Sequence, residues 1–184
     1  MILSKVIIMK LKSKFILVIS ILTLIIILAV FIHHQKQSPV EKYMQHYYKH
    51  ASYRNMELVD IAEYKDYKLE LYTFNKSGTV ICAFLLKKDS KNNFAIVQTS
   101  DIIQNFKRFY IFDYCNDVDN DVLTCILSDG TPKSVKIDID GELKNFDMDK
   151  EGLGGYIFEL ENSTEKWLSY TFYDENGRNV NDTD

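Results

Sequence analysis

The chain has 184 residues, a length that suits one domain with short accessory segments. Residues 1–32 contain no Asp or Glu, so 33–184 holds all 26 acidic residues against 18 of the 22 basic ones, a formal charge of −8. Such an acidic segment lacks the basic surface that binds nucleic acid or anionic lipid headgroups. We therefore expect no nucleic-acid partner.

The stretch from Phe15 to Ile32 contains 18 consecutive uncharged residues. As a helix it is about 27 Å long, close to the roughly 30 Å of a bilayer's hydrocarbon core. Ser20 and Thr23 are tolerated there because their hydroxyl groups can bond back to helix carbonyls. The segment also lacks the polar stripe of a surface helix. We expect a transmembrane helix over 15–32, with the membrane as its partner.

The flanks of this segment favour a signal anchor that is retained. The run exceeds the roughly 7 to 15 apolar residues of a signal peptide, and Val30, Phe31 and Ile32 are not the small residues of a cleavage site. Cleavage is the alternative. Four lysines precede the span: Lys5, Lys10, Lys12 and Lys14. The positive-inside rule then places 1–14 in the cytoplasm and 39–184 outside the membrane, after a linker at 33–38.

A short helix is predicted directly after the linker, over 39–51. Ser38 can cap it, Pro39 suits the first helical position, and Glu41 completes a capping box. Apolar residues then follow at helical spacing and give the helix one apolar face. We expect this face to pack on a sheet.

From Met56 onward the pattern is that of β-strands. Residues 134–139 alternate between apolar and polar, and 80–86 is apolar on both faces, as in a central strand. The predicted strands are 56–63, 67–74, 80–86, 94–99, 106–114, 122–127, 134–139, 143–147, 156–161 and 166–173.

Turn residues separate these strands. Gly-containing turns occur at 75–78, 129–130, 140–141 and 176–177, and Gly152, Gly154 and Gly155 predict a looser loop. The fold class is therefore mainly β (α+β), with an antiparallel β-sandwich or a barrel-like sheet after the short helix. The break between 99 and 106 is expected to divide two β subregions that share one core.

Several strand and turn runs resemble those of a known group of proteins. These runs are Glu57 to Ile61, Tyr67 to Phe74, Ala83 to Lys88 and Tyr170 to Gly177. With them, most of the segment 39–184 resembles small anchored or secreted proteins of unknown function from low-GC Gram-positive bacteria. The resemblance implies an extracytoplasmic β domain of the cell envelope and carries no activity or site residues.

The chain has three cysteines, all of which lie in the part expected outside the membrane. Cys115 and Cys125 flank the polar stretch 116–121, so a hairpin could bring them together as a disulfide in an oxidising compartment. A diagonal placement across the hairpin would strain that bond. Cys82 is expected to be a small buried hydrophobic residue.

Two groups of residues are considered as metal ligands. His46 and His50 are spaced i, i+4 on the predicted helix, and Asp117, Asp119 and Asp121 match the first acidic positions of a calcium loop. The helix pair has no obvious third ligand, and the loop has Val122 where Gly is needed. Solvent-facing histidines and an Asp-rich turn are the favoured interpretations.

Aromatic residues are concentrated in one predicted strand, at Phe106, Phe109, Tyr110, Phe112 and Tyr114. Exposed aromatics there could stack on sugar rings and form a binding face. Aromatic residues are also common in ordinary half-buried strands, and this is the favoured interpretation.

No motif assigns an activity or a cofactor. All four histidines precede residue 51, and the sequence has no nucleophile elbow, phosphate loop or dinucleotide fingerprint. We expect a membrane-tethered, non-catalytic module that binds a protein, a peptide or an envelope polymer. The alternatives are an envelope hydrolase that uses dispersed carboxylates and a metal-responsive sensor.

Overall fold

The computed structural model describes residues 19–28, 30, 37–47, 56–74, 79–116, 121–161, 163 and 166–181. The chain divides into two compact units, Met1–Lys42 and Tyr43–Asp184. Each unit is considered by itself below.

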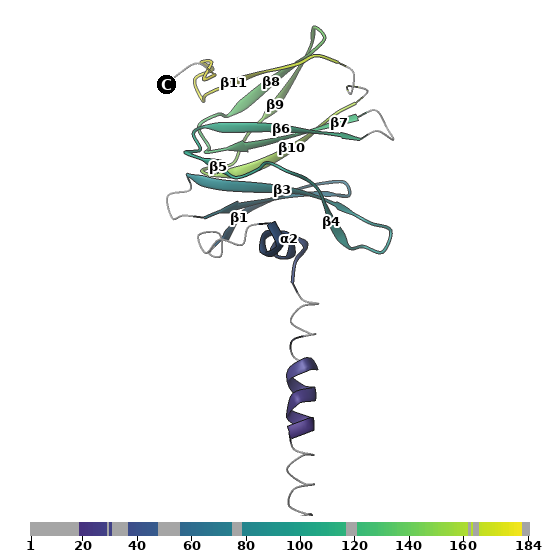
Figure 1. Ribbon diagram of the computed structural model, residues 1–184. Coiled ribbons are helices and arrows are strands. Elements are labelled where there is room, and N and C mark those ends of the chain that lie inside the picture. The colour runs from purple at the N-terminus through teal and green to yellow at the C-terminus, as the bar shows by residue number, and fades with distance from the viewer. Residues whose placement is uncertain are drawn as a thin grey trace, which may run out of the picture. The chain divides into compact units, whose positions relative to one another are not determined.

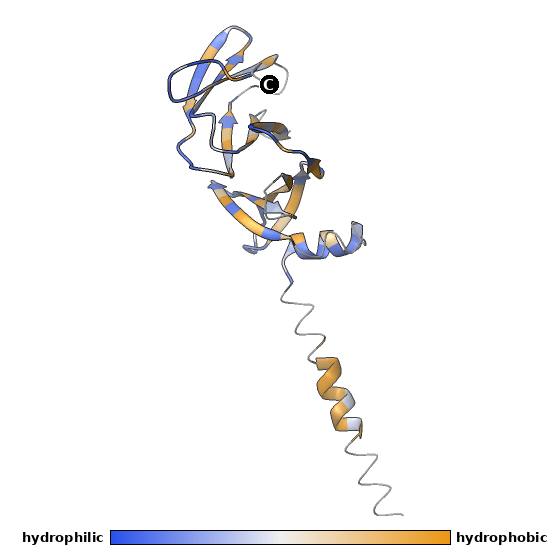
Figure 2. Cartoon of the chain, turned by 90° about the vertical axis from the view of Figure 1, so that its left-hand side faces the viewer, coloured by the Kyte–Doolittle hydropathy of each residue, from blue (hydrophilic) through white to orange (hydrophobic). Residues whose placement is uncertain are grey.

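The first unit contains the apolar helix. Residues 19–28 and 30 are helical and mostly hydrophobic (Figure 2). Their large apolar side chains are exposed. The Thr23 hydroxyl donates to the Ile19 carbonyl oxygen at 2.9 Å, as expected for a helix in an apolar medium. The rest of the predicted span 15–32, residues 1–14 and residues 33–36 lie outside the described residues. Within the described parts, no helix combines the length and apolar character needed to span a membrane.

Helix α2 runs over Pro39–Tyr47 and begins with the predicted capping box. The Ser38 hydroxyl accepts a hydrogen bond from the Glu41 amide at 3.1 Å. The Glu41 carboxylate in turn accepts a hydrogen bond from the Ser38 amide at 2.9 Å. Residues 48–51, where the helix is predicted to end, lie outside the described residues.

The second unit contains three antiparallel sheets. Sheet A has the order β1 (Glu57–Tyr64), β2 (Tyr67–Thr73), β3 (Val80–Lys88), β4 (Phe94–Thr99), and β5 (Ile103–Gln104) also pairs with β3. Sheet B has the order β10 (Gly154–Leu160), β7 (Asp121–Ser128), β6 (Phe109–Asn116). Sheet C has the order β11 (Leu168–Tyr173), β8 (Ser134–Ile139), β9 (Glu142–Asp147).

The sheets are stacked in three layers with sheet B in the middle (Figure 1). The first core lies between sheets A and B and includes Leu69, Leu71, Ile81, Leu85, Phe112, Leu123, Cys125 and Leu127. The second core lies between sheets B and C and includes Val122, Ile126, Val135, Ile137, Tyr156, Leu160 and Phe172. Strand β7 contributes alternate residues to each core and is therefore buried on both faces.

The two outer faces of this stack differ. On sheet A, the face opposite the first core is buried at Glu70, Tyr72, Cys82, Phe84 and Leu86. Tyr43, where the second unit begins, packs edge-on against Phe84 with ring centroids 5.6 Å apart. The chain thus enters this unit beside sheet A, and sheet C lies at the opposite end of the stack (Figure 1).

The mainly β, antiparallel fold is confirmed, and two finer expectations need correction. The strands form three separate sheets and two cores rather than one shared core, and no sheet closes into a barrel within the described residues. Gly154 and Gly155 belong to β10 rather than to a loop. A Cβ atom would lie 2.8 Å from Lys150 Cδ at Gly154 and 2.9 Å from Leu69 Cδ2 at Gly155, so a larger residue at either position would displace that side chain.

Candidate functional site

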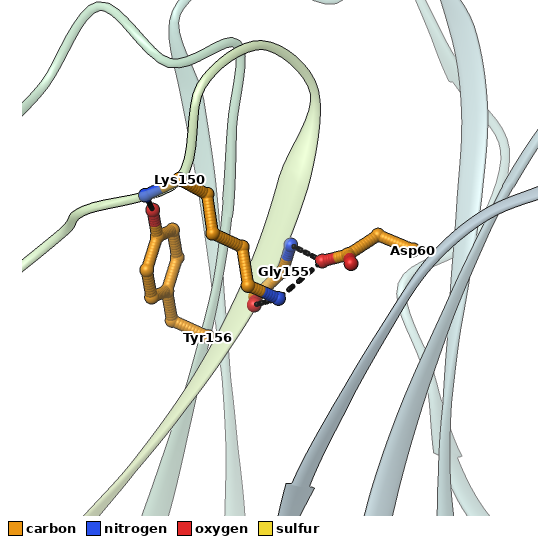
Figure 3. Close-up of polar contacts among 4 residues, drawn as sticks. All are labelled: Asp60, Lys150, Gly155 and Tyr156. Atoms are coloured by element: carbon orange, nitrogen blue, oxygen red, sulfur yellow. Dashed lines mark hydrogen bonds and ion pairs between the residues drawn. The ribbon is translucent and has the colours of Figure 1, made fainter.

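A polar cluster joins β1 of sheet A to β10 of sheet B (Figure 3). The Lys150 ammonium group forms an ion pair with Asp60 and donates to the Gly155 carbonyl oxygen at 2.8 Å. The Gly155 amide donates to Asp60 Oδ2 at 2.8 Å, and the Lys150 amide donates to the Tyr156 hydroxyl at 2.8 Å. A bulge in β1 directly before Asp60 shifts the register of the strand at this point.

This cluster is a structural link between the two sheets, and such a polar link between sheets is called a tie below. Burial raises the pKa of Tyr156 and so keeps its hydroxyl protonated, which makes it a poor base. The neighbouring Gly154 and Gly155 lie close to the side chains of Lys150 and Leu69, which leaves little open space beside the cluster. The Asp60 carboxylate already accepts from both Lys150 and Gly155.

A second tie joins the same two sheets near the β1–β2 turn. The Tyr64 hydroxyl donates to Glu159 Oε2 at 2.8 Å, and Lys65 Nζ lies 2.8 and 2.6 Å from the two Glu159 oxygens. The Lys65 hydrogen bond is the main cause that lowers the pKa of Glu159, so the carboxylate stays charged.

A third tie joins sheets B and C. The Thr124 hydroxyl donates to Asp113 Oδ1 at 2.7 Å, and the Tyr170 hydroxyl donates to the two Asp113 oxygens at 3.0 and 3.1 Å. Burial, reinforced by the Asp113 charge, raises the pKa of Tyr170. On the outer face of sheet A, the buried Glu70 is similarly held by Lys68 at 2.5 Å and by the Tyr72 hydroxyl at 2.7 Å. These carboxylates therefore serve the packing of the sheets.

The predicted metal ligands are only partly described. His46 lies in α2 with its ring edge-on to Tyr47 at 4.7 Å, and Asp121 is the first residue of β7. His50, Asp117 and Asp119 lie outside the described residues. Where side chains are described, no three or more His, Cys, Asp or Glu residues are grouped closely enough to hold a metal ion.

The aromatic residues of 106–114 do not share one exposed face. Phe106 and Phe112 are buried in the first core, and Tyr114 packs against it. Phe109 stacks on Phe172 of the second core at 3.8 Å. Tyr110 is the exposed member, at 36%. The reason is that sheet B is the middle layer, so both of its faces are covered by other sheets.

The possible disulfide between Cys115 and Cys125 is not formed, and all three cysteines are free. Cys115 pairs with Val122, whereas Cys125 pairs with Phe112, so the two cysteines are three positions out of register. They therefore point to opposite faces of sheet B, about 10 Å apart along the strands, beyond the reach of a disulfide. Cys115 is exposed, while Cys82 and Cys125 are buried.

The outer face of sheet C is the sheet face that the fold leaves open. We define it by the residues that alternate with those of the second core: Ser134, Lys136, Asp138, Leu143, Asn145, Asp147, Ser169, Thr171 and Tyr173. Trp167 lies directly before β11, and the same alternation continued by one residue assigns it to the edge of this face. None of these residues is buried. Trp167 is 85% exposed and Leu143 is 56% exposed.

The backbone beneath Trp167 is held in place by the β8–β9 turn. The Asp140 amide donates to the Trp167 carbonyl oxygen at 3.1 Å, and the Trp167 amide donates to Asp140 Oδ1 at 3.0 Å. Asp140 and Gly141 both have positive φ angles, of 52° and 91°, which is the type I′ geometry that an Asp-Gly hairpin favours. The indole is thus exposed from an ordered backbone.

Comparison of the chain with protein-family models, with curated proteins and with solved structures gives no match.

The sequence-based candidates do not include Trp167, although a signal for it exists. Within 166–173, Trp167 alternates in phase with Ser169 and Thr171 and out of phase with Leu168, Tyr170 and Phe172. A large aromatic residue on the polar side of a strand is the signature of an exposed platform. The density of aromatics in 106–114 is a weaker signal, because density does not distinguish a middle layer from an outer one.

Proposed function

We propose that this chain is a single-pass protein of the cytoplasmic membrane whose residues 39–184 form a non-catalytic binding module outside the cell membrane. Its ligand contacts the outer face of sheet C. The observation that carries the proposal is the 85% exposed side chain of Trp167 on an ordered sheet face. A large exposed aromatic residue is costly to keep in water and is a common centre of binding surfaces.

The apolar helix supports the tether. Residues 24–28 are all exposed and all apolar, and five consecutive residues cover every side of a helix. Moving such a surface from water into hydrocarbon is favourable by about 25 cal/mol per Å². The four lysines before this segment support an N-terminus that stays inside.

The arrangement of layers supports the choice of face. The chain enters the second unit at Tyr43, whose ring packs on Phe84 at the outer face of sheet A, so this outer face is partly covered within the unit itself. The outer face of sheet C is at the other end of the stack and carries the exposed indole. A ligand can therefore approach this face without displacing a part of the second unit.

The placement outside the membrane can be tested with the chain's own cysteines. Cys115 is exposed, whereas burial raises the pKa of Cys82 to about 11 and also raises that of Cys125, so both buried thiols stay protonated and unreactive. We expect a membrane-impermeant maleimide, applied to intact reduced cells, to label the full chain, and Cys115→Ser to remove the label. Labelling that requires cell lysis would contradict the proposal.

The binding face can be tested by photo-crosslinking in intact cells. A photoreactive residue at Ser169, next to Trp167 on the outer face of sheet C, should form adducts with a component of the cell envelope. The matched control is the same residue at Lys91, in the exposed turn between β3 and β4. Equal adducts from both positions, or none from Ser169, would rule out this face as the binding surface.

A further inference from the structure

We infer that the outer face of sheet C binds a neutral polysaccharide, with the indole of Trp167 stacked on a sugar ring. This inference rests on the proposed function and names the chemical class of its ligand. The C–H face of a sugar ring is apolar while its rim carries hydroxyl groups, so it matches an aromatic platform surrounded by hydrogen-bonding side chains.

The face has this composition. Trp167 lies at one end, and the next row across the three strands is Ser169, Asp138 and Leu143. The following row is Thr171, Lys136 and Asn145. Rows are about 7 Å apart along the strands, and neighbouring strands are about 4.8 Å apart. An extended polymer that leaves the indole along β11 thus meets hydrogen-bonding side chains within the length of one or two sugar units.

Charge argues against an anionic polymer as the ligand. The face carries Asp138 and Asp147 against the single Lys136. Beside Trp167, the carboxylate of Asp140 is balanced by the exposed Lys166, so the face keeps a small excess of negative charge. Residues 33–184 as a whole have a formal charge of −8. A polymer rich in phosphate or carboxylate groups would be repelled by both the face and the domain that carries it.

The distribution of apolar groups argues against a protein ligand. Trp167 and Leu143 are the large apolar residues that are strongly exposed on this face, and strand β8 lies between them with Asp138 and Lys136 pointing outward. Specific protein interfaces are built around a contiguous apolar centre that is fully desolvated on binding. Here a single flat platform in a polar surround is better matched to a hydroxyl-rich ligand.

Trp167 provides a direct test because it is the chain's single tryptophan. The full chain, held in lipid nanodiscs or in a detergent without a sugar headgroup, is titrated with neutral oligosaccharides of glucose, N-acetylglucosamine and mannose. We expect at least one of them to shift the indole emission to shorter wavelength and to reduce its quenching by acrylamide, in a saturable way. An oligogalacturonate of similar length, which is anionic, should have no effect.

Two variants locate the binding. Asn145→Ala, on the exposed strand β9, should weaken binding up to about tenfold through the loss of one hydrogen bond. Trp167→Ala should abolish retention on the insoluble form of the bound polysaccharide. Tyr110→Ala, which removes an exposed aromatic residue from sheet B, is the control and should leave retention unchanged.

The outcomes separate this inference from the proposed function. If no neutral oligosaccharide affects Trp167 while Ser169 still forms envelope adducts, the polysaccharide assignment is overturned and the binding face stands. If the anionic oligosaccharide binds as well as a neutral one, the assignment to a neutral ligand is also overturned. If Ser169 forms no adducts and Trp167 does not respond, the binding face itself is refuted.

Discussion

The tyrosine hydroxyls at the sheet interfaces differ in how they are satisfied. Tyr156 accepts a hydrogen bond from the Lys150 amide, and Tyr64 donates to Glu159. The Tyr67 hydroxyl, by contrast, is buried in the first core without a hydrogen-bond partner in the described part of the chain. A buried polar group that makes no hydrogen bond costs about 1–3 kcal/mol.

Tyr67→Phe should therefore leave the free energy of unfolding unchanged or raise it by about 1 kcal/mol, because it removes only the unsatisfied hydroxyl. Tyr156→Phe is the matched variant and should lower it by about 1 kcal/mol through the loss of the Lys150 hydrogen bond. Urea unfolding of both variants measures the difference. A larger loss in Tyr67→Phe than in Tyr156→Phe would show that the Tyr67 hydroxyl has a partner.

Gly130 is required by a close approach of two backbones. Its φ is +89°, and a Cβ atom would lie 2.4 Å from the Gly152 amide nitrogen. Gly177 also has a positive φ, of +73°, but a Cβ atom there would meet nothing within 4 Å. The two glycines thus share a backbone preference and differ in the space around them.

Gly130→Ala should consequently destabilise the chain more than Gly177→Ala does. We expect about 1 kcal/mol for Gly177→Ala, from backbone strain alone. For Gly130→Ala we expect more than about 2 kcal/mol, because the backbone of the 150–153 segment must also move. Melting temperatures of the two variants give the comparison. Similar values for both would mean that Gly152 can shift at little cost.

At the scale of elements, most strands follow from the sequence. The predicted strand at 134–139 is identical to β8, and 67–74 and 94–99 match β2 and β4 to within one residue. These segments have strong alternation or apolar runs bounded by turn residues, so local pattern determines them. The Asp140-Gly141 turn follows for the same reason.

The local sequence pattern does not predict every strand boundary or strand pairing, because some of them are determined by features outside the strand itself. The predicted strand at 106–114 begins late, at Phe109, because Asn105 and Arg108 have positive φ angles of 55° and 60°, which residue type alone does not signal. The division into three sheets also depends on which strands pair over long distances. For the same reason Trp167 is strongly exposed, whereas most of the aromatic residues of 106–114 are covered.

The tie between sheets B and C makes stability depend on pH. Burial raises the pKa of Tyr170 above its ordinary value near 10, so the folded state holds this proton more tightly than the unfolded state does. The stabilisation that the protonated Tyr170 hydroxyl adds to the folded state is complete below about pH 10. It is lost as the pH rises through the folded-state pKa. Tyr170→Phe removes this titration.

We therefore expect the free energy of unfolding to fall above about pH 10 and to fall less steeply in Tyr170→Phe than in the unchanged chain. Tyr64, Tyr156 and Cys82 also have raised pKa values, so the variant keeps part of the slope. Urea unfolding at a series of alkaline pH values measures both slopes. An identical pH dependence would show that the Asp113–Thr124–Tyr170 tie does not hold in solution.

At the scale of the whole molecule, the two cores depend on one another through sheet B. Ile126 and Leu127 are neighbours in β7, yet Ile126 belongs to the second core and Leu127 to the first. Among the sheets that the structure describes, sheet C shares its core with sheet B, so it loses most of that core when β7 unfolds. The exposed face that carries Trp167 is thus supported by residues two layers away.

Leu127→Ala tests this dependence because it touches the first core only. Removing a fully buried leucine should cost about 2–5 kcal/mol. If the second unit unfolds cooperatively, hydrogen exchange in β8, β9 and β11 should accelerate by the same free energy, although Leu127 contributes nothing to the second core. Leu143→Ala, at an exposed position, should change exchange little. Unchanged protection of sheet C in Leu127→Ala would mean that sheets B and C hold together without the first core, and that the outer face of sheet C is stabilised locally.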